Sequence, residues 1–540
     1  MEERRGETTA GRDNVPPAIE QKSDMNDPHP EEDVRKMLQD AMAKHQSGQL
    51  DDAERLYQRV LQSDEQNVQA RRLWGILARE RGDLAGSLEI LNKSSGGTDE
   101  DPDLLCELAL THFAAGHLQI ANTLLHQVLA RQPDSLKTLA NLGALLQYTG
   151  HINEAITYHQ RVVDMDPSDL EVRYNLAKSL VDAGRGDEAI AECESVVAMT
   201  SGQPFALSIK GSVLCDLEQF DAAAEVLEQA VAADPANDLA LISLGYAQRQ
   251  LGKPDLAAET LRQAVKINPH NAGSTAELIN ILTAQDRQQE ALTLGENFLI
   301  RHRGERMVLA AYAYALRDAG REDEAHALLD FDQLIHVIDL EKPTGFKSLD
   351  SFNQSLAGLI TGHPSLLFSP KSKATHGGGQ TGELNFDDDP ALSALGALIH
   401  KAVMDRAESF RGADIADQTL MAHPPENWSI RVWGTVLESE GCQTPHNHPL
   451  GWLSGVYYVQ LPSDMAQAGW QSGWLEFGAP PERYMVACEP ALRAVEPKEG
   501  RLVLFPSYFY HRTKPFRSSG SRVSIAFDVV PSSVPVPATA

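Results

Sequence analysis

Small and apolar side chains recur along the front half of the chain with a period of 34 residues. Glycine marks the same position of most periods, and Glu218 and Asp286 fill that position in two others. Five residues after each marked position the chain has alanine or serine. The pattern predicts two helices per period, with a turn at the glycine and small side chains where the helices approach closely. The marked glycines are Gly48, Gly82, Gly116, Gly150, Gly184, Gly252 and Gly320.

A helical hairpin cannot bury its apolar face alone, so these units are expected to stack into an α-solenoid. In period and pattern, residues 34–339 resemble the tetratricopeptide repeat, with about nine units. An ordinary helical bundle would not keep this register over so many units. The resemblance implies a concave surface that binds a protein or peptide partner. The histidines of this region follow no ligand spacing and are expected to be solvated helix residues: His112, His117, His126, His151 and His159.

Polar stretches flank the repeats. Residues 1–33 have too few apolar side chains to offset the entropy of ordering, so we expect a disordered tail. After the repeats, Pro343 and Gly345 mark a boundary, and a helix is expected over residues 349–361. The acidic run at 387–390 predicts a helix start, with carboxylates at the positive end of the dipole. Its spacing lacks the alternation of a calcium-binding loop.

From Trp428 onward the pattern changes to short apolar runs that alternate with polar residues, which is typical of β-strands. Many short strands with glycine and proline turns predict an antiparallel barrel or jelly roll over residues 345–530. The chain is thus expected to be a multidomain α plus β protein, with a loose tail at residues 531–540. The further strand-like runs are 452–461, 473–477, 484–488, 491–495, 501–506 and 523–530.

Composition narrows the range of partners. The net charge of −29 disfavours nucleic acid as the main partner, because phosphate binding needs clustered lysine and arginine. It disfavours an anionic membrane surface for the same reason. Five scattered cysteines form no CxxC motif, which is typical of a reducing compartment. The sequence shows neither a signal peptide nor an apolar run of membrane-spanning length, so we expect a soluble, cytoplasmic protein.

Candidate chemistry gathers in the strand-rich region. One residue separates His446 from His448, so in an extended chain their side chains point to the same face. His511 follows another apolar run, and Arg522 opens the last one. We expect the three imidazoles to bind one metal ion and Arg522 to hold an acidic co-substrate beside it. Other histidines are expected to be surface residues, namely His376, His400 and His423.

The order of these residues resembles the C-terminal core of the 2-oxoglutarate/Fe(II)-dependent oxygenases. Residues 453–459 after the histidine pair, 504–507 before His511, and 375–378 upstream resemble a bacterial and phage branch of that superfamily. The resemblance covers residues 345–530 and implies a double-stranded β-helix, with Fe(II) as the metal and 2-oxoglutarate and O₂ as co-substrates. It also implies hydroxylation of a C–H bond. From the architecture, with a repeat stack ahead of this domain, we expect the substrate to be a protein or peptide that the repeats present.

The resemblance assigns roles residue by residue. His446 and His511 match the two histidine ligands, and His448 stands where the superfamily usually has aspartate or glutamate. His448 either binds the metal as a neutral imidazole or stands aside and leaves a two-histidine centre. Arg522 matches the arginine that pairs with the far carboxylate of 2-oxoglutarate. Ser524 lies on the same strand face as Arg522 and is expected to donate a second hydrogen bond to that carboxylate. Tyr458 either matches a tyrosine that contacts the same group or is an aromatic residue of the core.

Three alternatives stay open on sequence alone. A cupin-type metal enzyme or sensor shares the His-x-His pair and the spacing from Gly500 to His511, but no glutamate follows the pair at the cupin spacing. A repeat scaffold with a degenerate barrel would explain the missing carboxylate, yet it leaves Arg522 without a purpose. A structural zinc site is disfavoured, because paired cysteines are absent and prolines flank the histidine pair.

Overall fold

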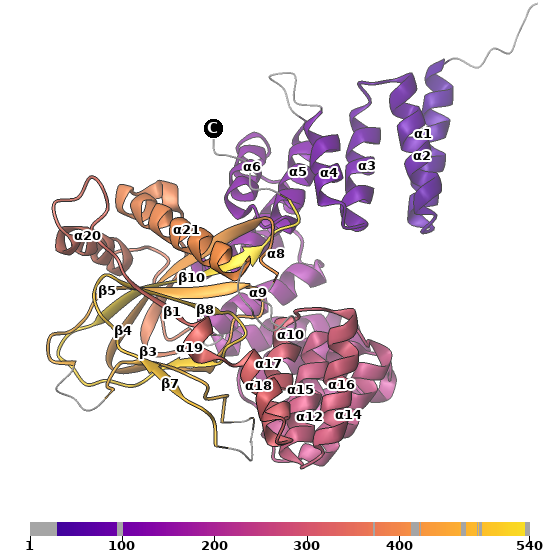
Figure 1. The fold of residues 1–540 in the computed structure, drawn as a ribbon. Helices are drawn as coiled ribbons and strands as arrows, with labels where there is room; N and C mark the ends of the chain where they lie inside the picture. The colour runs from indigo at the N-terminus through magenta and orange to yellow at the C-terminus, as the bar shows by residue number, and fades with distance from the viewer. Residues whose placement is uncertain are drawn as a thin grey trace, which may run out of the picture.

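The computed structural model describes residues 30–93, 101–370, 373–411, 421, 423–465, 471–482, 484 and 489–534. A stack of helices makes up the front of the chain, and a β-domain packs on one side of it (Figure 1). Most of the two predicted tails (1–29 and 535–540) and of the predicted strand 484–488 lies outside the described residues. Within the described part, no helix is both long enough and apolar enough to cross a membrane.

The front half folds into antiparallel helix pairs, which confirms the predicted α-solenoid. In residues 30–93 and 101–328 the helices form nine successive pairs, and each pair packs against the next. The helices are α1 (Pro30–Gln46), α2 (Leu50–Ser63), α3 (Val68–Glu80), α4 (Leu84–Asn92), α5 (Pro102–Ala114), α6 (Leu118–Arg131), α7 (Leu136–Tyr148), α8 (Ile152–Met165), α9 (Leu170–Asp182), α10 (Gly186–Met199), α11 (Pro204–Asp216), α12 (Phe220–Ala233), α13 (Asp238–Gln250), α14 (Pro254–Ile267), α15 (Ala272–Ala284), α16 (Gln288–Arg301), α17 (Arg306–Asp318) and α18 (Glu322–Leu328).

The turn inside each helix pair uses a residue in the left-handed backbone region. The marked glycines have φ angles between 69° and 80°. Glu218 and Asp286 adopt the same conformation, with φ angles of 60° and 57°, although a side chain makes it less favourable there. The structure therefore confirms that these two residues occupy the glycine position, as their place in the register predicts.

Close packing between the two helices of a pair explains the small residues. A Cβ atom on Gly143 would lie 2.4 Å from Cδ2 of His159. His159, His112 and His117 are all buried, so the prediction of solvated histidines is wrong for these three, whereas His126 is exposed. Imidazole takes the place of an apolar side chain there, which the spacing of the residues does not reveal. Burial lowers the pKa of His112 and of His159 to about 4, so both rings are neutral at pH 7.

The β-domain is one antiparallel sheet, ten-stranded within the described residues, as the jelly-roll prediction requires. Its strand order is β1-β8-β5-β10-β4-β9-β6-β7, with β3 beside β4 and β2 beside β3. Strands that are distant in sequence are therefore neighbours in space. The strands are β1 (His336–Asp339), β2 (Leu367–Phe368), β3 (Thr375–Glu383), β4 (Trp428–His446), β5 (Leu453–Gln460), β6 (Leu475–Phe477), β7 (Arg493–Val495), β8 (Arg501–Pro506), β9 (His511–Thr513) and β10 (Arg522–Pro531).

Two of these strands differ from the sequence pattern. β1 pairs with β8 at one edge of the sheet. It therefore belongs to the β-domain, although the predicted repeat region extends to residue 339. β3 arises from a stretch rich in glycine, serine, lysine and threonine, where no apolar alternation predicts a strand. Its glycines allow a close approach to β4, since a Cβ atom on Gly378 would lie 2.3 Å from the carbonyl oxygen of Val436.

Helices also belong to the β-domain. α20 (Leu349–Thr361) lies where the sequence predicts it and packs against β4, β5 and α21 (Pro390–Arg411). α21 follows the acidic run, and Asp389 Oδ1 accepts a hydrogen bond from the backbone nitrogen of Ala391 at 2.7 Å. The predicted capping role of this run is thereby confirmed. The remaining short helices are α19 (Phe331–Leu334) and η1 (Phe386–Asp388).

The β-domain contacts the repeats at several places along the stack. Near the end of the stack, the Tyr314 hydroxyl donates to the carbonyl oxygen of Gly478 at 3.0 Å. At the fourth repeat, the backbone nitrogen of Glu383 donates to the carbonyl oxygen of Thr149 at 2.6 Å. Val534, within the segment expected to be a loose tail, is 8% exposed and packs into an apolar cluster of the second and third repeats. The two parts of the molecule therefore share a long interface.

Candidate active site

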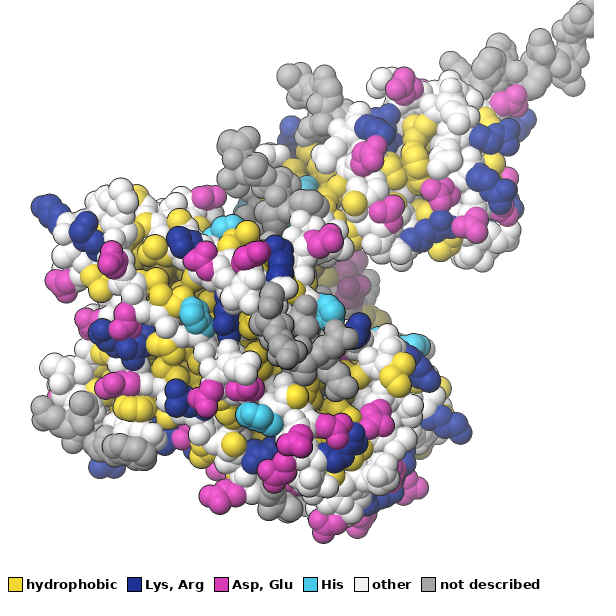
Figure 2. Space-filling view, viewed as in Figure 1, with side chains coloured by type: hydrophobic (Ala, Val, Ile, Leu, Met, Phe, Trp, Pro, Cys, Tyr) yellow, Lys and Arg dark blue, Asp and Glu magenta, His cyan; other side chains and the backbone are white. Residues whose placement is uncertain are grey.

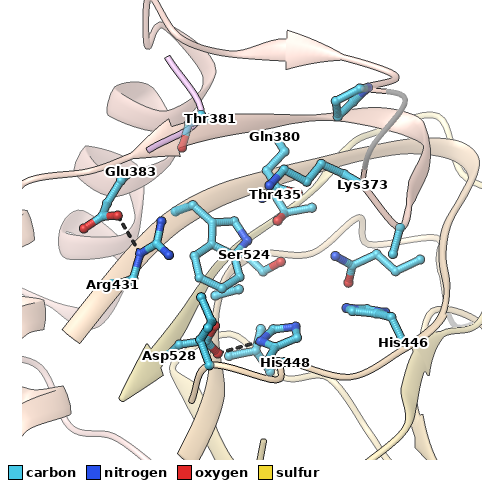
Figure 3. Close-up of a pocket in the computed structure, with 18 of the residues that line it drawn as sticks. Lys373, Gln380, Thr381, Glu383, Arg431, Thr435, His446, His448, Ser524 and Asp528 are labelled. Atoms are coloured by element: carbon cyan, nitrogen blue, oxygen red, sulfur yellow. Dashed lines mark hydrogen bonds and ion pairs between the residues drawn. The ribbon is translucent and has the colours of Figure 1, made fainter. Parts of the chain in front are cut away.

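A cavity of about 440 Å³ opens where the sheet meets the repeats. Its wall comes from strands β2, β3, β4, β5, β6, β8, β9 and β10 and from residues of the fourth and fifth repeats. His446, His448, His511, Arg522 and Ser524 all line it, so the fold brings these sequence-predicted residues together. Figure 3 shows His446 and His448 side by side at this cavity.

Three imidazoles meet on one side of the cavity. His446 ends β4 and pairs in register with His511, which begins β9, and His448 follows in the turn after β4. One ligand nitrogen from each ring lies within 4.8 Å of those of the other two. This spacing suits three donors around one metal ion. In the described part of the chain, no other group of histidine, cysteine or acidic residues is arranged in this way.

Hydrogen bonds decide which nitrogen of each ring is available. Nδ1 of His446 and Nδ1 of His511 lie 2.7 and 3.0 Å from backbone carbonyl oxygens two residues away. Nδ1 of His448 lies 2.5 Å from Oδ1 of Asp528. Carbonyl and carboxylate oxygens only accept hydrogen bonds, so each Nδ1 carries the hydrogen. Nε2 of every ring therefore keeps a free lone pair.

The surroundings of His446 and His511 favour the neutral form of both rings. Desolvation lowers the pKa of His446 to about 4 and lowers the pKa of His511 well below its ordinary value. The neighbouring imidazoles lower both pKa values further, because a second positive charge would be repelled. The rings of Phe505 and Phe477 lie 4.7 and 6.1 Å from that of His511. Neutral imidazole is the form that binds a metal.

Arg522 begins β10, and its side chain is 1% exposed. Its Nε has no hydrogen-bond partner among the described residues, and its Nη1 lies 3.4 Å from the hydroxyl oxygen of Ser524. No acidic side chain of the described residues forms an ion pair with it. Burial lowers the pKa of Arg522, because the guanidinium has lost water without gaining a counter-charge. An anion in the cavity would supply that charge.

Polar groups surround Arg522. Ser524 and Thr435 are paired across β10 and β4, both line the cavity, and the Thr435 hydroxyl has no partner among the described residues. The ring of Tyr458 lies 5.0 Å from the guanidinium carbon of Arg522. Tyr458 is fully buried but does not line the cavity, so it lies behind the arginine and not on the wall. Burial raises the pKa of its hydroxyl, which keeps the phenol protonated.

Family models match both parts of the chain. Residues 431–528, which include the three histidines and Arg522, match the family described as "Putative 2OG-Fe(II) oxygenase". The chain combines tetratricopeptide repeats with a domain of this oxygenase family. Both resemblances drawn from the sequence are thereby confirmed. The repeat models match residues 39–102, 146–204 and 210–272.

Among solved structures, similar chains are repeat proteins. A tetratricopeptide repeat protein from Parabacteroides merdae is 13% identical, with 45% of this chain and 97% of that chain covered and a TM-score of 0.40. PilF from Pseudomonas aeruginosa is 18% identical, with 38% and 93% covered and a TM-score of 0.32. YrrB, described as a TPR protein with an unusual peptide-binding site, is 17% identical, with 35% and 96% covered and a TM-score of 0.25. No curated protein sequence matches the chain.

The oxygenase domain has side chains that fit the metal and co-substrate implied by its family name. Three imidazoles are suitable donors to Fe(II). The unpaired guanidinium of Arg522, next to two hydroxyl groups, fits a carboxylate. The set departs from the usual superfamily pattern because His448 replaces an acidic ligand. The structure places His448 with the other two rings and not apart from them.

Sequence reasoning missed Asp528, which contacts His448. Its signal was the alternation along β10, where Arg522, Ser524 and Asp528 fall on one strand face between buried apolar residues. Sequence reasoning also missed the repeat residues, for which no signal exists, because their position depends on how the two domains dock. The repeat residues at the cavity are Gln147, Tyr148, Thr149, Gly150, Ile152 and Asp182.

Arg431 joins the oxygenase domain to this repeat wall. Its Nε donates to Glu383 at 2.8 Å, as the dashed line in Figure 3 shows. Its guanidinium carbon lies 4.3 Å from the ring centre of Tyr148, and its Nη2 donates to the Tyr148 carbonyl oxygen at 3.1 Å. These contacts hold the fourth repeat against the rim of the cavity.

Proposed function

We propose that the protein is a 2-oxoglutarate- and Fe(II)-dependent dioxygenase that hydroxylates a protein or peptide held by the repeats. One observation carries the proposal: a single cavity is lined by three imidazoles and by a buried arginine that has no acidic partner among the described residues. The family match supports the general class of chemistry. Neither a metal site alone nor an anion site alone would require both sets of residues in one cavity.

Each residue has a role in this proposal. His446, His448 and His511 hold Fe(II) through Nε2, and Arg522 holds the far carboxylate of 2-oxoglutarate with help from Ser524. When bound, the metal and its co-substrates would supply the oxidising power that hydroxylates a C–H bond. The protein orients these groups: the Nδ1 hydrogen bonds fix each imidazole, and the strand pairing of β10 with β4 and β5 fixes Arg522.

The rim of the cavity supports a polypeptide substrate. Tyr148 of the fourth repeat and Leu450 of the oxygenase domain both line the cavity, and they are 43% and 49% exposed. Exposed aromatic and aliphatic side chains at a rim are suited to contacts with a polypeptide. Elsewhere on the visible face of the repeats, acidic and basic side chains are interspersed (Figure 2). We therefore place substrate recognition at the rim, where repeat and oxygenase residues meet.

The proposal is tested by loading the full-length protein with Fe(II) without oxygen and then adding 2-oxoglutarate and air. We expect consumption of oxygen and release of one succinate per 2-oxoglutarate, even without the polypeptide substrate. His511→Ala should abolish both. Peptides that gain one oxygen atom with the wild-type protein, but not with His511→Ala, would identify the substrate.

The scaffold and cupin-type alternatives predict a different result. The absence of an acidic ligand from the histidine group favours the scaffold alternative but not the cupin-type one, which needs a glutamate. A protein that binds iron tightly but neither consumes 2-oxoglutarate nor releases succinate would contradict the dioxygenase proposal. A closed structural zinc site is disfavoured, because the histidine group offers three ligands and faces a cavity.

A further inference from the structure

Asp528 contacts His448 at Nδ1, the nitrogen that the proposed metal does not use. Its Oδ1 lies 2.5 Å from that Nδ1 and accepts a hydrogen bond from the hydroxyl of Ser454 at 2.6 Å. The carboxylate is 13% exposed, and no lysine or arginine of the described residues forms an ion pair with it. Figure 3 shows Asp528 aimed at the His448 ring. The partner of this carboxylate is therefore an imidazole of the candidate metal site.

Neighbouring strands hold this contact in place. Asp528 on β10 stands opposite Ser454 on β5 in the strand register. The hydroxyl oxygen of Ser454 lies 2.9 Å from that of Ser507, the residue after β8. The backbone nitrogen of His448 donates to the carbonyl oxygen of Ser507 at 2.9 Å. Both partners are thus fixed by the same part of the sheet, which distinguishes the contact from a chance meeting of mobile side chains.

The charge of the site gives this contact a chemical meaning. The three imidazoles bring no negative charge to a divalent metal, whereas an acidic ligand would. A histidine that donates its Nδ1 hydrogen to a carboxylate binds a metal more strongly through Nε2, because the carboxylate fixes the ring and raises its basicity. Asp528 is the acidic side chain that contacts the histidine group in the described residues. The carboxylate of Asp528 therefore places one negative charge directly behind His448, the residue that stands where an acidic ligand is usual.

We propose that Asp528 is a positioning residue that fixes the hydrogen of His448 on Nδ1, directs its Nε2 to the metal and supplies the negative charge that the direct ligands lack. This inference rests on the proposed function only in that the three histidines bind a divalent metal. It does not depend on turnover. The rival explanation is a purely structural hydrogen bond, whose loss would lower stability and leave the metal affinity of the folded protein unchanged.

Titration of the full-length protein with Co(II), followed by calorimetry and by the visible absorption of the bound ion, distinguishes the two. We expect Asp528→Ala to weaken Co(II) binding by about 10- to 100-fold. Asp528→Asn keeps an oxygen acceptor of the same size but loses the charge, so we expect a smaller loss of affinity and a changed Co(II) spectrum. Glu383→Gln is the matched control: it removes a carboxylate from the same cavity that pairs with Arg431 and not with a histidine, and Co(II) affinity should not change.

A second measurement does not need the metal. Nitrogen chemical shifts of the His448 ring in the metal-free protein report which nitrogen carries the hydrogen. We expect Nδ1–H in the wild type and in Asp528→Asn, and a mixture of the two tautomers in Asp528→Ala. If Asp528→Ala does not fold, Asp528→Asn alone decides through its affinity and spectrum.

The outcomes separate this inference from the proposed function. Wild-type affinity for Co(II) in both folded Asp528 variants would overturn the positioning role. No Co(II) binding by the wild type would overturn this role and the proposed function together. Tight Co(II) binding that Asp528→Ala weakens, without any consumption of 2-oxoglutarate by the iron-loaded wild type, would overturn the dioxygenase proposal and leave the positioning role supported.

Discussion

Glu107 in the repeats and Arg522 in the oxygenase domain are both buried charged side chains, but only Glu107 has a counter-charge among the described residues. Glu107 in the repeats is 3% exposed and forms ion pairs with Arg79, at 2.7 Å, and with Lys137. Arg522 in the oxygenase domain is 1% exposed and has no acidic partner in the described residues. A buried charge that the chain leaves unpaired destabilises the fold unless a ligand neutralises it. The comparison indicates that Glu107 serves folding and that Arg522 serves binding.

Buried histidines differ between the two regions in the same way. His159 in the repeats is fully buried against Gly143, and neither of its ring nitrogens has a hydrogen-bond partner among the described residues. His511 in the oxygenase domain has its Nδ1 engaged and its Nε2 free beside two other imidazoles. Burial and a depressed pKa are common to both histidines. A metal ligand is distinguished by the fixed orientation of its ring and by other donor atoms close to its free nitrogen.

The largest difference in metal affinity should come from replacing one histidine of the candidate metal site and, for comparison, one buried histidine of the repeats. His511→Ala removes a proposed ligand, so we expect the Co(II) affinity to fall by more than about 100-fold, beyond the range for groups that act through a ligand. His159→Leu should leave that affinity unchanged, because His159 lies in the repeats. Calorimetric titration of both variants checks this. Equal losses in the two variants would mean that the three-histidine group is not the binding site.

The two buried charges offer the next contrast. Arg522→Met should weaken 2-oxoglutarate binding to the Co(II)-loaded protein by about 100-fold, because a charge-assisted pair is lost. It should not lower the free energy of unfolding of the ligand-free protein, since no partner is left unpaired. Arg79→Met should lower that free energy by about 1–3 kcal/mol, because Glu107 then loses one of its two cations. Titration and denaturant unfolding of both variants measure these effects. Destabilisation of the ligand-free protein by Arg522→Met would indicate a structural arginine.

The same contrast explains how much of the fold and of the site can be predicted from the sequence alone. In the repeats each unit packs against its neighbours along the chain, so a fixed period reveals the fold, and even Asp286 could be assigned to a glycine position. Contacts across the sheet join distant segments, and β3 gave no signal because glycine replaces the alternating side chains. The histidine set and Arg522 could be named because their residue types and order are characteristic. Tyr148 could not be named, because it reaches the cavity only through the way the repeats pack against the oxygenase domain.

Buried histidine in the repeats should make stability depend on pH. Burial lowers the pKa of His159 to about 4, whereas an unfolded histidine titrates near 6.5. Between these values the unfolded chain binds the extra proton, so the stability of the folded protein is lost as the pH falls from 6.5 towards 4. From pH 7 to pH 5 the loss should be about 2 kcal/mol.

His159→Leu tests this titration without a cavity, because Leu227 and Leu261 occupy the equivalent positions opposite Gly211 and Gly245 in later repeats. Between pH 7 and pH 5 we expect the free energy of unfolding of this variant to fall by about 2 kcal/mol less than that of the wild type. Unfolding in denaturant, followed by helical circular dichroism, measures the difference. His126→Leu is the control, since His126 is exposed. A similar change in both variants would show that histidine burial is not the cause.

The smallest effects on 2-oxoglutarate affinity should come from Ser524, on the cavity wall, and from Tyr458, in the layer behind that wall. Ser524 lines the cavity beside Arg522, so Ser524→Ala should remove one hydrogen bond to the co-substrate and weaken 2-oxoglutarate binding by about fivefold, close to 1 kcal/mol. Tyr458 lies behind the arginine, and Tyr458→Phe keeps the ring that packs against the guanidinium. Its effect on 2-oxoglutarate affinity should therefore be smaller than that of Ser524→Ala. Titration of the Co(II)-loaded variants ranks the two. A larger effect from Tyr458→Phe would mean that the phenol reaches the ligand, which would require Arg522 to move aside when 2-oxoglutarate binds.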